Sequence, residues 1–139
     1  MSLYLDLNTT LRKAVNATTL NYLGSPLPMY WALDDYTESG AHVVVTKETT
    51  DPNPQSMGSN PPQDLSGFLQ LVIKLPRTDD TLDAYLSDLA GQVWEQFPVS
   101  TYQDGNIKMV INNVSAGTHL TVGGYASVTM RINFNAMYC

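Results

Sequence analysis

Residues 67–97, GFLQLVIKLPRTDDTLDAYLSDLAGQVWEQF, decide the fold. They open with a short, nearly continuous apolar run rich in β-branched residues, which predicts a buried strand over residues 68–75. Pro76 lacks the amide hydrogen that a strand ladder needs and ends this strand. Apolar residues then recur at helical spacing, which predicts an amphipathic helix over residues 82–97, with Pro98 ending it.

The acidic segment between the strand and the helix is typical of a helix start. Thr78 and Asp79 offer side-chain oxygens to the first amides of the helix, and the neighbouring carboxylates favour the positive end of its dipole. A strand and a single helix cannot form a core alone, so flanking sequence must complete a sheet beneath the helix.

The N-terminal residues predict a second amphipathic helix, over residues 3–20. Ser2 is its expected N-cap, and an apolar stripe runs from Leu3 to Val15. Asp6, Arg12 and Lys13 are expected to face away from the sheet.

Four further strands are predicted from alternating or β-branched patterns. They cover residues 30–33, 42–46, 106–114 and 125–134. The last has the clearest alternation, which is typical of an antiparallel strand with one face on the core. Loops are expected at residues 22–28, 47–66, 99–105 and 115–124, followed by a short tail over residues 135–139.

The segment 47–66 is polar and holds four prolines, so it cannot be a core element. Loops of this length are usually functional, and we expect this one to become ordered against a partner. The whole chain therefore predicts a single α+β domain. Its sheet should be mixed and mostly antiparallel, with four or five strands and two amphipathic helices packed on it.

Composition excludes several function classes. The net charge is −6 and the seven Lys and Arg residues do not cluster, which argues against phosphate-mediated binding of nucleic acid. Only 14% of residues are charged, against about a quarter in average proteins, and this suits a surface buried by partner subunits. No apolar run is long enough to span a membrane, and the single Cys139 favours an intracellular folding compartment.

Residues for catalysis or metal binding are not grouped in the sequence. His42 and His119 each stand alone, without a second ligand at metal-binding spacing. Adjacent carboxylates such as Asp34 and Asp35 point apart along a chain. We therefore expect a protein that is not an enzyme and that has no cofactor and no metal.

The order and lengths of these segments resemble those of the tail terminator (tail completion) proteins of long-tailed bacteriophages, the family of minor tail protein U. The matching segments are residues 3–20, 22–31, 42–46, 67–73, 82–97, 105–111 and 125–134. They span nearly the whole chain, and segment 47–66 departs most from the family pattern.

The resemblance implies a structural protein of the virion, located at the tail–neck region and assembled in the host cytoplasm. Such proteins form a ring, a homohexamer, on the tail tube protein, stop tube polymerisation, and offer a surface to the head completion or connector protein. DNA passes through the lumen without specific binding. We expect subunit or partner contacts at Tyr30, Trp31, Pro52, Pro54, Met57, Pro61, His119 and Arg131. Arg131, on the polar face of the last strand, is the first candidate to pair with a neighbour's carboxylate.

Alternatives of other kinds stay open from the sequence. A head–tail connector or another neck or tube protein would belong to the same assembly. A small acidic hydrolase or transferase would need His42, His119 and a carboxylate to converge. A glycan-binding module would use Tyr and Trp side chains as platforms.

Overall fold

The computed structural model describes residues 3–32, 40–49, 53–54, 63–77, 82–98, 100–104 and 107–138. Its helices are α1 (Leu3–Asn16) and α2 (Leu82–Gln96). Its strands are β1 (Asn21–Tyr22), β2 (Ser25–Pro26), β3 (Met29–Trp31), β4 (His42–Thr49), β5 (Asn53–Pro54), β6 (Gln63–Pro76), β7 (Thr101–Asp104), β8 (Ile107–Ala116), β9 (Leu120–Val122) and β10 (Tyr125–Tyr138).

The main sheet has the strand order β3-β4-β6-β10-β8-β7, with β5 added to β6 and β9 added to β10. All of its pairs are antiparallel except β3–β4, so the expected mixed, mostly antiparallel sheet is confirmed. The expected number of four or five strands is wrong, because the described chain contributes eight strands to this sheet. Several of these are two- or three-residue strands, too short to leave a sequence pattern.

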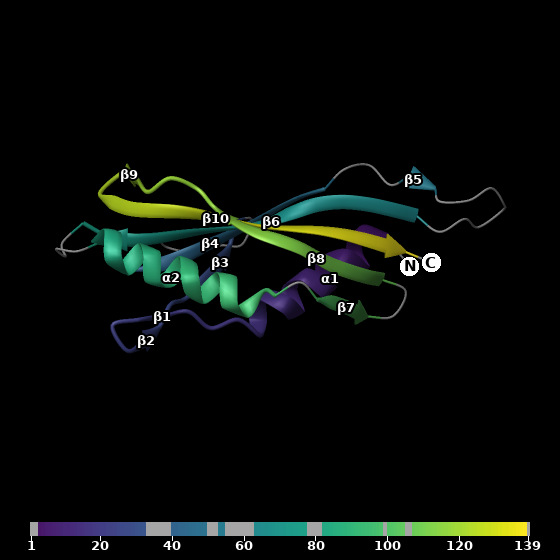
Figure 1. Ribbon diagram of the computed structural model, residues 1–139, viewed down its shortest axis with the longest axis horizontal. Coiled ribbons are helices and arrows are strands. Elements are labelled where there is room, and N and C mark those ends of the chain that lie inside the picture. The colour runs from purple at the N-terminus through teal and green to yellow at the C-terminus, as the bar shows by residue number, and fades with distance from the viewer. Residues whose placement is uncertain are drawn as a thin grey trace.

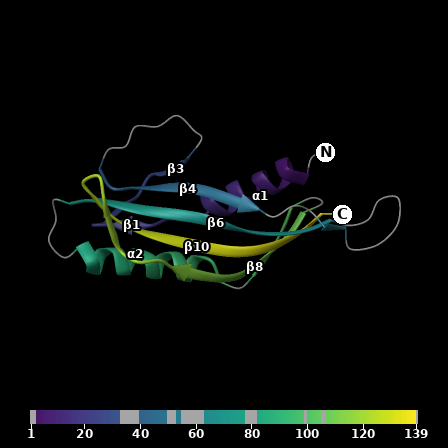
Figure 2. The same ribbon diagram turned by 90° about the horizontal axis from the view of Figure 1, so that it is seen from above.

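Both helices lie on the same side of the sheet (Figure 1), and seen from above they run along its two flanks (Figure 2). The fold is therefore α+β, with one face of the sheet packed on helices. We call the helix-covered face the inner face and the opposite one the outer face.

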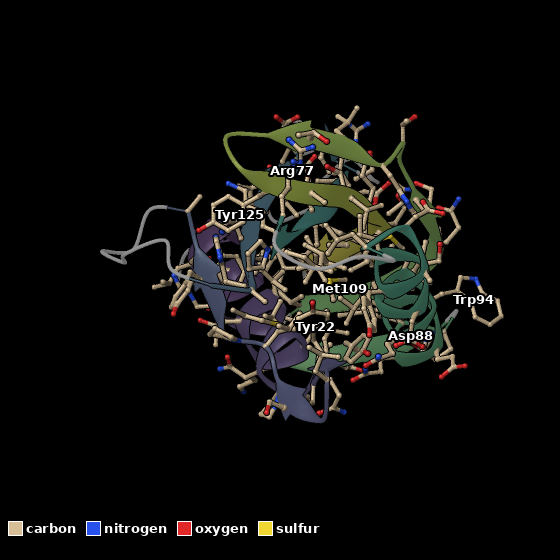
Figure 3. All side chains as sticks on the ribbon, turned by 90° about the vertical axis from the view of Figure 1, so that its left-hand side faces the viewer. Tyr22, Arg77, Asp88, Trp94, Met109 and Tyr125 are labelled. Carbon is tan, nitrogen blue, oxygen red and sulfur yellow. The ribbon has the colours of Figure 1, made fainter. Side chains whose placement is uncertain are left out.

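The core forms where alternate residues of the three central strands meet the apolar stripes of the helices. Met109 of β8, for example, lies in the middle of the molecule (Figure 3) and is fully buried. The buried apolar residues of β6 and β10 on this face are Leu65, Leu69, Leu71, Ile73, Leu75, Ala126, Val128, Met130, Ile132, Phe134 and Ala136. From the helices come Leu7, Leu11, Ala14, Val15, Leu86, Leu89 and Val93. The predicted apolar stripe of residues 82–97 and the predicted alternation of residues 125–134 are thus confirmed. In residues 68–75 the expectation of a wholly buried run is wrong, because Phe68 and Val72 lie on the outer face and are only half-buried.

β6, α2 and β8 form a strand–helix–strand unit in which β10 lies between the two strands. β6 and β8 are both antiparallel to β10 and therefore parallel to each other, and β10 lies between them. The chain leaves β6, passes through α2 and β7, and returns as β8.

The first helix is shorter than predicted, since α1 ends at Asn16 and not at residue 20. Thr18 donates its hydroxyl to Ala14 O at 2.9 Å, and its amide bonds Val15 O three residues back, a tightened last turn. Part of the expected loop 22–28 is a small hairpin of β1 and β2, and Leu23 and Gly24 at its turn both have positive φ. The prediction for Arg12 is also wrong, because this side chain is half-buried and its guanidinium lies 4.6 Å from the Trp31 ring centroid.

The other three predicted loops and the predicted tail also contain strand residues. The expected loop 115–124 includes the last two residues of β8 and all of β9. The loop 47–66 is shorter than expected, since β4 continues to Thr49 and β6 begins at Gln63. Residues 101–104 of the expected loop 99–105 form β7, and the expected tail 135–139 is strand as far as Tyr138. These segments pair with other strands, and that stabilisation has no local sequence signature. The predicted caps Ser2, Thr78 and Asp79 lie outside the described residues.

Two glutamines of α2 fasten the segment that follows α1. The Asn21 amide donates to Gln92 Oε1 at 2.8 Å, and Gln92 Nε2 donates to Asn21 O at 3.0 Å. Gln96 makes the same two bonds to the Thr19 backbone, at 2.9 and 2.7 Å. Each side-chain amide therefore acts like a neighbouring peptide group and joins the two helical flanks of the inner face.

Position 67 of β6 requires glycine, because the backbone at the end of β4 lies very close to it. A Cβ at this position would overlap the Glu48 carbonyl oxygen and approach Thr49 Cα to 2.9 Å.

Replacing Gly67 by alanine should therefore lower the free energy of unfolding by about 1–3 kcal/mol, measured by urea denaturation. Gly91→Ala is the matched control, because a Cβ there meets no atom within 4 Å and should stabilise α2 by about 0.5–1 kcal/mol. Equal effects of the two substitutions would contradict the close crossing.

Candidate functional site

The outer face of the sheet is polar and carries no helix of the described chain (Figure 1). Its residues are those that alternate with the core positions along the central strands. Across β6, β10 and β8 they include Gln70, Val72, Lys74, Thr129, Arg131, Asn133, Asn113 and Ser115. A sheet face of this kind, rich in neutral polar groups, suits contact with another protein surface.

One end of the outer face is hollowed. A cavity of about 630 Å³ opens between β6, β10 and the segment that leaves β8. We call it the outer hollow, and it is lined by Gln70, Ser115, Ala116, Gly117, Thr118, Leu120, Thr129 and Arg131. The Gly117 amide bonds Thr129 O at 2.8 Å and so holds this segment close to β10.

Arg131 stands at the rim of the outer hollow and is exposed. Its guanidinium lies 4.8 Å from the centroid of the Phe68 ring, which supports it from one side through a cation–π contact. Next to it along β10, Asn133 donates to Asn113 across the strands at 2.8 Å. The side chain predicted to pair with a carboxylate is therefore held on the open face of the sheet, where another protein can reach it.

The sequence predicted a solitary His119, and this prediction is wrong. Its Nδ1 lies 2.5 Å from Oδ1 of Asp83 in the first turn of α2. The imidazole is 30% exposed and the carboxylate 87% exposed, so this is a surface contact. It connects the segment beside the outer hollow to α2.

His42 is fully buried, although it lies on the outer side of β4. Its Nδ1 is 2.9 Å from Gly40 O, and its ring packs against Tyr125 at 5.4 Å and Tyr30 at 6.0 Å between centroids. Strands β6 and β10 separate His42 from the β9 residues that follow His119. The hydrolase interpretation requires the two histidines to converge on one site, and they do not.

Tyr30 and Trp31 lie on opposite faces of β3. Tyr30 faces His42 on the outer side, whereas Trp31 packs beneath Arg12 on the side of α1. Both are half-buried, and they cannot form one aromatic platform. Of the predicted contact residues in the polar loop, Pro54 belongs to β5, and Pro52, Met57 and Pro61 lie outside the described residues.

Trp94 is a surface residue that the sequence interpretation missed. It is 65% exposed and projects from α2 away from the sheet (Figure 3). Beside it a cavity of about 410 Å³ is lined by Trp94, Glu95, Phe97, Pro98, Asn112, Asn113 and Val114. The signal was available, because Trp94 falls outside the apolar stripe of residues 82–97.

Among the described residues, no group of three or more His, Cys, Asp or Glu side chains is arranged to hold a metal ion. No helix in the described part of the chain has the length and apolar character needed to cross a bilayer.

No protein-family profile and no curated protein matches this sequence. One solved structure is similar with a TM-score of 0.68 at 16% sequence identity, and the match covers 99% of this chain and 94% of the other. At this identity the likeness shows a shared fold, over nearly the full length of both chains.

Asp83→Ala should loosen the segment beside the outer hollow. Amides of residues 117–122 should exchange with solvent about two- to five-fold faster, as expected for the loss of one exposed charge contact. Hydrogen exchange followed by NMR measures this. Glu95→Ala removes an exposed carboxylate from the other end of α2 and should leave these amides unchanged; unchanged rates in Asp83→Ala would mean that the His119 contact does not hold the segment.

Proposed function

We propose that this protein is a structural subunit of a long-tailed phage that caps the tail tube, stops its polymerisation and presents a surface for the head connector. In this proposal it acts as a ring of identical copies and catalyses no reaction. The proposal rests on the order of segments that resembles the tail terminator proteins, and the α+β fold of the described residues is compatible with it.

The observation that carries the proposal is the open outer face. A face with no covering helix of the described chain, rich in neutral polar groups and with Arg131 at the rim of a hollow, is suited to docking on another protein. Its neutral polar groups can meet a partner without the large cost of desolvating buried charges.

The charge balance supports the same role. At −6, each copy adds to the negative potential of a ring, and a negative lumen repels DNA phosphates. DNA would then pass without being held.

A head–tail connector is the second candidate within the same assembly, since it would also dock through an open polar face. Deleting the gene should separate the two. We expect overlong tail tubes in electron micrographs of the null mutant, because nothing stops polymerisation. Full heads separate from tails of normal length would instead assign the protein to the connector, and normal particles would reject both functions.

Arg131→Ala should impair joining of the protein to its neighbours in the particle. Loss of one exposed charged contact predicts a reduction of about three- to ten-fold in complementation of the null mutant. Arg77→Ala is the matched control, because Arg77 is exposed in the turn after β6 and does not line the outer hollow. Full complementation by Arg131→Ala would show that this side chain makes no essential contact.

A further inference from the structure

Trp94 is an aromatic side chain that the described part of the chain leaves uncovered. Its indole is 65% exposed and projects from α2 away from the sheet (Figure 3). Among the described residues, neither a cation nor a second aromatic ring stacks on it. Large aromatic side chains that stay exposed in this way often act as anchors in contacts with other proteins.

Two other partly exposed aromatic rings of this chain are each covered by an arginine. The Arg12 guanidinium lies 4.6 Å from the Trp31 ring centroid, and that of Arg131 lies 4.8 Å from the Phe68 ring centroid. A guanidinium stacks on such rings because it is planar, weakly hydrated and attracted to the negative π face. Tryptophan has the most attractive face for a cation. Trp94 therefore offers the kind of surface that arginines of the chain cover elsewhere.

The cavity of about 410 Å³ beside this indole has an apolar wall. We call it the Trp94 cavity, and its lining residues are Trp94, Glu95, Phe97, Pro98, Asn112, Asn113 and Val114. Phe97, Pro98 and Val114 can pack against the methylene groups of a long side chain. The volume is within the range of about 300–1,000 Å³ in which proteins bind small groups.

A bulge in β8 adds polar groups to the same cavity. The pairing of β10 with β8 passes from Phe134 opposite Ile111 to Asn133 opposite Asn113, so Asn112 is the extra residue. Because a bulge redirects side chains, two consecutive asparagines can line one cavity, and both are exposed. Their carboxamide oxygens can accept N–H groups from the strand side of the cavity.

The helix side of the cavity is acidic. Glu95 carries the one charged side chain among the described residues that line it. The whole of α2 contributes Asp83, Asp88 and Glu95, and its sequence holds no lysine or arginine. A carboxylate beside an open indole suits a guanidinium, because one flat cation can stack on the ring and donate to the carboxylate.

We propose that the Trp94 cavity binds an arginine side chain of a different protein. The guanidinium stacks on the indole and donates to the Glu95 carboxylate, while its methylene groups pack on Pro98 and Val114. A second copy of this chain is a poor source of that side chain. The sequence holds three arginines, and Arg12 and Arg131 already lie on rings of their own chain.

This inference goes beyond the proposed function, since it concerns a surface of α2 and β8 and not the outer hollow. It does not require the partner to belong to a phage. The experiments below use the purified protein, so their outcome is independent of the tail length of the null mutant.

Titration with acetyl-arginine amide, followed by NMR, tests the site. The Trp94 indole N–H signal should shift and saturate with a dissociation constant of about 1–10 mM. The Trp31 indole, which Arg12 already covers, is an internal control and should not shift. Acetyl-citrulline amide has nearly the same shape without the charge, and it should bind at least about fivefold more weakly. Equal affinities, or no saturable shift with the arginine compound, would overturn the inference.

Substitutions in the cavity test the two contacts. Trp94→Leu should abolish the saturable shifts of the Asn112 and Asn113 backbone amides, and Glu95→Gln should weaken binding about three- to tenfold. Glu48→Gln is the matched control, because Glu48 is an exposed carboxylate of β4 outside the cavity, and it should bind like the wild type. Equal weakening by the two glutamine variants would reduce the effect to net charge and overturn the assigned contact.

Two further comparisons test the source of the arginine. Free L-arginine should bind more weakly than the capped amide, because its own carboxylate is repelled by Glu95. Tighter binding of the free amino acid would assign the cavity to a small molecule and overturn the inference. Trp94→Leu should leave the sedimentation equilibrium of the purified protein unchanged. Weakened self-association would instead place Arg77 of a second copy in the cavity, which overturns the assignment to a different protein.

Discussion

The pairing of β6 with β10 is the constraint on which the rest of the structure depends. The two strands match residue by residue from Tyr125 opposite Pro76 to Tyr138 opposite Gln63, without interruption. Because side chains alternate along a strand, this single register places the buried apolar residues of both strands on the inner face, and on the outer face most of the polar ones together with Phe68 and Val72. A shift by one residue would exchange the two faces, so the core and the outer hollow are specified by the same register.

The two faces of the sheet differ in what covers them and in their chemistry. The inner face is closed by α1 and α2 and tied across by Gln92 and Gln96, so it supplies stability. The outer face is broad and polar, and in the proposed function it meets other chains.

The sequence predicts those parts of the fold that rest on local periodicity. The strand in residues 68–75, the helix in residues 82–97 and the alternation of residues 125–134 are of this kind. The ends of β6 and β10, residues 63–66 and 135–138, form strands because they pair with each other, and this pairing leaves no local signal. The candidate site was less predictable for the same reason. Arg131 could be placed on a polar strand face, but the contact of His119 with Asp83 joins residues 36 positions apart.

The central place of β10 has a consequence for biosynthesis. During translation β6 and β8 leave the ribosome before the strand that lies between them, so each exposes an unpaired edge with an apolar face until residues 125–138 follow. The sheet can therefore close only near the end of synthesis, and nascent chains that stall earlier are open to pairing with one another. Under the proposed function, the risk of premature assembly is thus greatest before the polypeptide is complete.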